Sequence, residues 1–218
     1  MNLTEAKKII LNNILGLKNE DEERIVRITV KIDPVDILAW LKSQDNSFKK
    51  IYWRDRASRF ACAGIGESVS VKGTEFPGYD HIVKEMTKYL NISPTGVRFY
   101  GGISFPSSTL KIKDWEEFGY YYFLLPLFDL IRYPTGVYFV CNLKLPLKDA
   151  QTVIEQLKKV NIVDEALFSI PVSIKYTERT DIPSLNEWKR NANNIIKEIK
   201  NNKFVKVVLA RKSTFKLK

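Results

Sequence analysis

The spacing of apolar runs in the middle of the chain allows few folds. Residues 130–133 and 137–145 are two such runs, and Pro134-Thr135-Gly136 between them is typical of a β-hairpin turn. Residues 50–55 and 59–66 predict a second hairpin, and Ile25–Ile32 alternates apolar and polar side chains as a half-buried strand does. Neighbouring hairpins favour antiparallel strands over a regular alternation of parallel strands and helices.

Helices are predicted between and after these strands. An amphipathic helix is expected within residues 1–20, and Asp33-Pro34 opens another as N-cap and first turn. Ser184 and Glu187 fit a capping box, and the helix behind them carries one apolar stripe. The remaining expectations are helices at residues 79–90 and 146–160 and strands at 97–105, 120–127 and 204–209. We therefore predict an α+β fold with a large antiparallel or mixed sheet and peripheral helices.

Composition bounds the class of protein. The chain has 218 residues, of which 44% are hydrophobic and 12% aromatic, enough for a sizeable core and too many for a disordered chain. No apolar run reaches the ~18 residues that span a membrane, and the N-terminus lacks the pattern of a signal peptide. We therefore expect no membrane partner. The two cysteines, Cys62 and Cys141, cannot build a disulfide scaffold or a metal cluster, which favours a reducing, cytoplasmic setting.

Positive charge is concentrated at one end of the chain. The net charge is +10, and Lys189–Lys218 holds ten basic residues and one acidic residue. Such an end binds nucleic acid in some proteins. Here it is patterned as a helix and a strand, which makes nucleic acid the less favoured partner. A solvated helix face, or a surface that meets something acidic, fits this pattern better.

Other candidate sites are weak. The single histidine, His81, excludes a His-rich metal site and leaves only one base for a Ser-His or Cys-His pair. Gly64 and Gly66 lack the further glycine that a nucleotide-binding loop needs. We expect these glycines to let another backbone approach closely.

Lys206 stands among apolar neighbours in the predicted strand 204–209. Period-two alternation places Phe204, Lys206 and Val208 on one face. Burying an ammonium without a partner favours its neutral form, and a neutral amine can act as a general base. The alternatives are a lysine that protects an edge strand from aggregation, or one whose ammonium reaches the surface.

Several segments resemble the chorismate-utilising enzymes. The most specific is Lys206-Val207-Val208-Leu209-Ala210-Arg211, which is similar to the KVVLAR signature of that family. The hairpin that runs from Tyr52 to Gly66 looks most like the isochorismate synthases of the menaquinone type. The resemblance covers roughly residues 25–218, and its weaker pieces are Tyr100–Phe105 and Trp115 with Phe123–Pro126.

The resemblance implies a fold and a reaction. The fold is a large antiparallel sandwich with helices outside. The reaction is the Mg²⁺-dependent conversion of chorismate to isochorismate, in which water adds at one ring carbon and a hydroxyl leaves from another. Lys206 matches the lysine that activates the water. Half of a salicylate synthase is an alternative, because no residue in these segments sets the product.

The residues that complete this chemistry are not matched in the chain. In the family, the general acid and the carboxylates that bind Mg²⁺ lie beyond the KVVLAR signature, and Glu116 and Glu117 have no spacing that supports them as substitutes. We therefore expect residues 1–218 to be the N-terminal half of the family fold, inactive alone and dependent on a complementary C-terminal half. The basic end would pack against that acidic half. The other hypothesis is a non-catalytic module that binds nucleic acid or another anion through its basic end.

Overall fold

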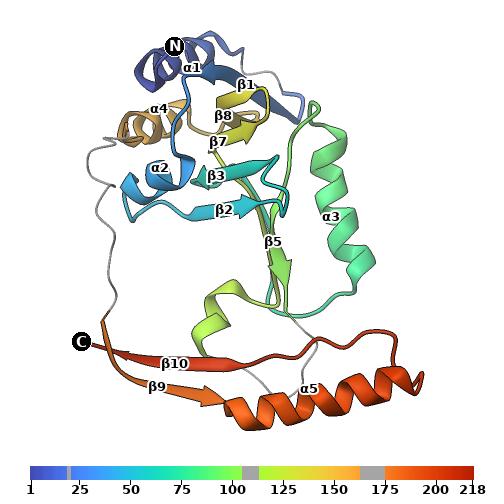
Figure 1. Ribbon diagram of the computed structural model, residues 1–218. Coiled ribbons are helices and arrows are strands. Elements are labelled where there is room, and N and C mark those ends of the chain that lie inside the picture. The colour runs from blue at the N-terminus through green and yellow to red at the C-terminus, as the bar shows by residue number, and fades with distance from the viewer. Residues whose placement is uncertain (19–20, 105–112, 163–174) are drawn as a thin grey trace. The chain divides into compact units, whose positions relative to one another are not determined.

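The computed structural model describes residues 1–18, 21–104, 113–162 and 175–218 (Figure 1). The chain forms two compact units, Met1–Leu167 and Phe168–Lys218. All strand pairs in the described residues are antiparallel and are accompanied by helices, which confirms the predicted α+β class. None of the helices in these ranges is long and apolar enough to cross a membrane.

A five-stranded sheet forms the centre of the first unit. Its order is β1-β8-β7-β3-β2, so the two predicted hairpins, β7-β8 and β2-β3, lie next to each other. The predicted Pro134-Thr135-Gly136 turn is confirmed, with Tyr133 paired to Gly136. The strands are β1 (Arg24–Ile32), β2 (Lys50–Arg54), β3 (Ala61–Ile65), β7 (Phe128–Tyr133) and β8 (Gly136–Leu145).

Three helices contribute to the main core on one face of this sheet: α1 (Leu3–Gly16), α2 (Ile37–Ser43) and α4 (Ala150–Lys159) (Figure 1). Alternation explains the arrangement, since Val30 and Ile32 of β1 are buried while Lys31 between them is exposed. Trp40 of α2 is fully buried and meets the ring of Phe139 edge-on, at 6.5 Å between centroids. Burial of such side chains is the main stabilising term of this unit.

A second, three-stranded sheet completes the first unit, in the order β4-β6-β5. Close backbone approach occurs in this sheet, where a Cβ at Gly101 would lie 1.9 Å from the carbonyl oxygen of Tyr122. At Gly64 the predicted close neighbour exists, but it is the side chains of Pro126 and Asp129 rather than backbone. The elements are β4 (Val69–Gly73), α3 (Tyr79–Asn91), β5 (Tyr100–Ile103), the 3-10 helix η1 (Lys113–Phe118) and β6 (Tyr121–Leu125).

Some predicted boundaries were wrong. Helix α2 begins after Asp36 rather than Asp33, because the Asp36 carboxylate accepts bonds from the amides of Leu38 and Ala39 at 2.9 and 3.1 Å. Helix α4 begins after Asp149, later than expected. The strand expected at 97–105 is shorter, and its last residue lies outside the described ranges.

The second unit is small and open. It contains β9 (Tyr176–Ile182), α5 (Leu185–Lys200) and β10 (Lys212–Leu217), and β9 pairs with β10. The capping box at Ser184 and Glu187 is confirmed. The strand predicted at 204–209 is wrong, because these residues lie in neither helix nor strand and β10 begins only at Lys212. No residue of α5 is fully buried.

Candidate functional site

Lys206 lies in the connection from α5 to β10 in the second unit. Its side chain is exposed, and its neighbours Val205 and Val208 are 100% and 80% exposed. The expectation that Lys206 sits on the apolar face of a sheet is therefore wrong within this chain. The catalytic role of Lys206 stays a prediction, and it requires a further surface to cover the segment.

The connection that carries Lys206 is fastened at both ends. At its start, the Lys203 ammonium lies 2.5 Å from the Glu198 carboxylate of α5, and the Lys203 amide donates to the Glu198 carbonyl. At its end, Arg211 donates from Nη2 to Asp181 at 2.9 Å and from Nε to the Pro183 carbonyl at 3.2 Å. Both ends of the segment are thus fixed by contacts within the unit, while the side chains at its centre face solvent.

The Asp181 carboxylate is the common acceptor of the contacts that hold the end of the connection. Besides Arg211, its carboxylate accepts bonds from the Ser213 hydroxyl at 2.5 Å and from Arg179 Nε at 3.1 Å. The hydroxyl of Ser213 and the two guanidinium groups lower the pKa of Asp181 below its ordinary value. Asp181 therefore stays ionised and keeps three elements together: β9, β10 and the end of the Lys206 connection.

A buried polar cluster lies inside the first unit. The Asp129 carboxylate of β7 is 1% exposed and accepts a bond from Asn142 Nδ2 at 2.9 Å. The Cys62 thiol lies 3.6 Å from its other oxygen, and Arg27 donates to the same Asn142 at 2.9 Å. The cluster therefore joins β1, β3, β7 and β8 on a single face of the sheet.

Burial dominates the electrostatics of this cluster. It raises the pKa of Asp129 to about 7, although Arg27 and the bond from Asn142 act in the opposite direction. Burial also raises the pKa of the Cys62 and Cys141 thiols well above their ordinary value, so neither is a reactive thiolate. The sequence analysis did not predict this cluster. The feature that could have indicated it is Asp129, a single acid within an apolar run.

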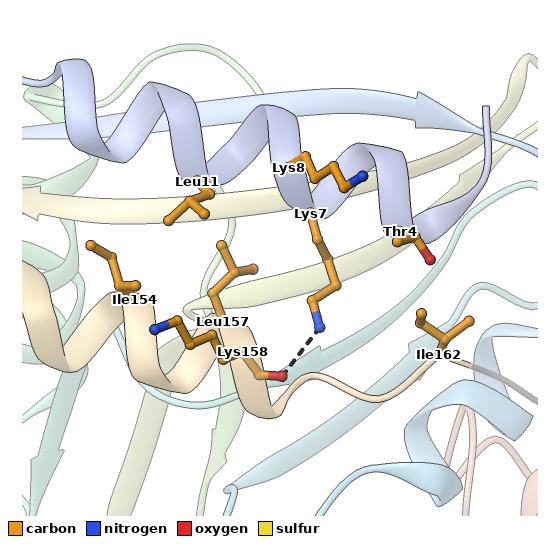
Figure 2. Close-up of a pocket in the computed structure, with 8 residues that line it drawn as sticks. All are labelled: Thr4, Lys7, Lys8, Leu11, Ile154, Leu157, Lys158 and Ile162. Carbon is orange, nitrogen blue, oxygen red and sulfur yellow. Dashed lines mark hydrogen bonds between the residues drawn. The ribbon is translucent and has the colours of Figure 1, made fainter.

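A shallow groove of about 250 Å³ runs between α1 and α4 (Figure 2). Leu11, Ile154 and Leu157 form its apolar side, and Lys7, Lys8 and Lys158 stand around it. The Lys7 ammonium is already engaged, since it donates to the carbonyls of Lys158 and Val160 at the C-terminal end of α4. In Figure 2 the three ammonium groups do not converge on one point, so the groove offers no built anion site.

The described residues do not form a magnesium site. They contain no group of three or more His, Cys, Asp and Glu side chains that could hold a metal ion. His81, Glu116 and Glu117 are all exposed. Glu67, which has a pKa lowered to about 2, is engaged with Lys49, Ser70 and Tyr122. The prediction that the Mg²⁺ ligands lie outside residues 1–218 stays a prediction.

Comparisons with known proteins agree over almost the whole chain. Residues 9–218 match the family described as chorismate binding enzyme. Isochorismate synthase MenF of Haemophilus influenzae is 25% identical over 220 residues, which cover 99% of this chain and 44% of that protein. MenF of Escherichia coli, described as the menaquinone-specific isochorismate synthase, has a similar fold, with a TM-score of 0.66 at 18% identity. That match covers all of this chain and 47% of the solved one. The chain thus spans less than half the length of these relatives.

Proposed function

Because the chain belongs to the family of chorismate-binding enzymes, we propose that residues 1–218 act as the N-terminal half of an isochorismate synthase. The other half of the catalytic fold either continues on the same polypeptide or comes from a second chain. The similarity to two MenF proteins supports this assignment. Menaquinone biosynthesis is the pathway that it implies.

In the proposed reaction Lys206 is the general base. Its neutral amine takes a proton from water, the oxygen of that water bonds to one ring carbon of chorismate, and a hydroxyl leaves another carbon with a proton from a general acid. Water enters and water leaves, so the product is an isomer of the substrate. The general acid and Mg²⁺ would come with the other half.

The observation that best supports the proposal is the exposed apolar surface around Lys206. The segment matches the family signature, yet Phe204, Val205 and Val208 are 52%, 100% and 80% exposed. Apolar side chains in this arrangement favour burial against a partner surface. Covering them would also take water away from Lys206, which favours its neutral form.

The charge of the second unit fits an acidic partner surface. Residues 175–218 include twelve basic and four acidic side chains. Two of those acids, Asp181 and Glu198, are engaged in ion pairs with basic residues of the same unit. A half that holds Mg²⁺ through carboxylates would supply the opposite charge.

The direct test uses the complete two-half protein with chorismate and Mg²⁺. We expect Lys206→Ala to lower kcat about 10²- to 10⁴-fold, the range attributed to a positioned general base. Lys197→Ala, which removes another exposed lysine from the same unit, is the control and should retain activity. Equal activity of Lys206→Ala and wild type would show that Lys206 is not the base. Residues 1–218 alone should not convert chorismate.

The cytoplasm is the location that we propose, because Cys62 and Cys141 are buried free thiols. Half of a salicylate synthase remains an alternative, and analysis of the product made from chorismate distinguishes it from an isochorismate synthase.

A second candidate is a binding module for polyanions, favoured by the excess of basic residues in the second unit. Affinity for duplex DNA, measured at two salt concentrations, separates the two functions. A steep loss of affinity with salt, together with a dissociation constant tighter than ~10⁻⁶ M, would favour the binding module. Weak binding to duplex DNA would favour the enzymatic function over the binding module.

A further inference from the structure

Arg211 closes the family signature that Lys206 opens, and the two side chains lie in different environments. Lys206 is exposed, whereas the Arg211 side chain is 25% exposed and its partner Asp181 20% exposed. Arg211 makes two contacts at the end of β9: one to the Asp181 carboxylate at 2.9 Å and one to the carbonyl of Pro183, which follows the strand, at 3.2 Å. A guanidinium presents its donors in a rigid planar fork, so it fixes the direction of two acceptors more strictly than the flexible side chain of a lysine does.

Resting on the proposed role of Lys206, we propose that Asp181 and Arg211 are positioning residues that fix the place of the Lys206 segment. The Asp181–Arg211 pair anchors the end of the connection to β9, and Ser213 ties the same carboxylate to β10 at 2.5 Å. Between Lys203 and Arg211 the chain has no regular secondary structure to fix its path. The position of Lys206 in the completed enzyme therefore depends on this anchor.

The physical basis is the sensitivity of a general base to distance. A base must reach hydrogen-bond distance of the water that it activates, and small displacements cost much of the rate. Loss of the anchor frees residues 204–210 to shift while Lys206 stays chemically intact. Because Asp181 and Arg211 need not touch the substrate, the effect should fall on kcat and leave KM nearly unchanged.

The first test needs no activity and uses the full chain of residues 1–218. In Asp181→Asn, ¹⁵N relaxation should show lower order parameters for the backbone amides of residues 204–210, because the charge-assisted hydrogen bond that fixes the end of this segment is lost. Glu178→Gln, on the same strand, is the matched control and should leave these order parameters unchanged. Unchanged order parameters at residues 204–210 in Asp181→Asn would overturn the proposal, as would an equal loss of order throughout β9 and β10.

The second test uses the complete protein with chorismate. Asp181→Asn should lower kcat about 10- to 100-fold with KM changed less than threefold. Asp181→Glu, which keeps a carboxylate for Arg211, should recover most of that loss. Full kcat in Asp181→Asn, while Lys206→Ala is inactive, would overturn the anchor and leave the proposed function standing. Full activity of Lys206→Ala would instead overturn the proposed function.

Discussion

The two units of this chain differ in how completely they bury their own side chains. In the first unit, residues such as Ile10 and Phe139 are completely buried, and the polar atoms of Asp129 and Asn142 have partners inside the sheet. In the second unit, α5 buries no residue fully and Val205 is completely exposed. A core of the first kind stabilises itself, whereas a surface of the second kind gains most from another surface.

This difference assigns most of the stability to the first unit and, under the proposed role of Lys206, the catalytic base to the second. The first unit contains the closed core, and the second contains the segment that matches the family signature. A surface that completes a site must remain open until its partner arrives, so low burial around Lys206 is consistent with its proposed role. The contrast can be tested by matched substitutions in the two units.

The largest expected effect concerns close packing in the first unit. Gly101→Ala should lower the free energy of unfolding by ~3 kcal/mol or more, because the new Cβ would lie 1.9 Å from the Tyr122 carbonyl oxygen. Gly102→Ala, one residue along the same strand, has nothing within 4 Å of its Cβ and should change stability by less than ~1 kcal/mol. Urea unfolding of both variants measures the difference. Equal losses of stability in the two variants would refute the close approach of Gly101 to the Tyr122 backbone.

The next largest difference in the free energy of unfolding is expected when an isoleucine of each unit is replaced by alanine. Ile10→Ala removes a fully buried side chain of α1 and should lower the free energy of unfolding by about 2–5 kcal/mol. Ile196→Ala removes a side chain of α5 that is 50% exposed and should change the value by less than ~1 kcal/mol. Thermal and urea unfolding test this pair. A large loss from Ile196→Ala would mean that the second unit has a core of its own.

The pH dependence of stability should reveal Asp129. In the unfolded chain this acid ionises near pH ~4, but in the folded state it keeps its proton up to a pKa of about 7. Between these values the folded state binds more protons, so its stability should fall as the pH rises, on the order of 4 kcal/mol in total. Asp129→Asn should flatten this slope between about pH 4 and 7. Asp45→Asn, in which an exposed acid of lowered pKa is replaced, should not change it.

The smallest effect is expected from the fastening at the start of the Lys206 connection. Lys203→Gln removes the ion pair with Glu198, in which the lysine side chain is 64% exposed, and should cost less than ~1 kcal/mol. Because this pair is exposed to solvent, raising the salt concentration should reduce the difference between variant and wild type. A difference that is independent of salt would show that Lys203 acts through packing instead.

Local sequence patterns predicted much of the fold. The turn at Pro134-Thr135-Gly136 and the capping box at Ser184 and Glu187 depend on a few adjacent residues, and both are confirmed. Asp33 and Asp36 are both good N-cap residues, so the start of α2 depended on which carboxylate reaches the free amides. Strand β4 was missed because Val69–Gly73 is short and mostly lacks strongly apolar residues.

The candidate site was harder to predict because it depends on partners distant in the sequence. Alternation around Lys206 indicated a strand, but a strand requires a paired neighbour, and β9 pairs with Lys212–Leu217 instead. Asp181 and Arg211 are thirty residues apart, and no periodicity connects them. Asp129 could be recognised as unusual from its apolar neighbours, but Asn142 and Arg27 as its surroundings follow only from strand order.

Hydrogen exchange of residues 204–209, compared between the chain of residues 1–218 and the complete two-half protein, tests the open surface most directly. We expect fast exchange in the shorter chain and strong protection in the complete protein, with β3 protected in both. Fast exchange at residues 204–209 in a complete protein that converts chorismate would contradict the assignment of this surface to the interface around Lys206.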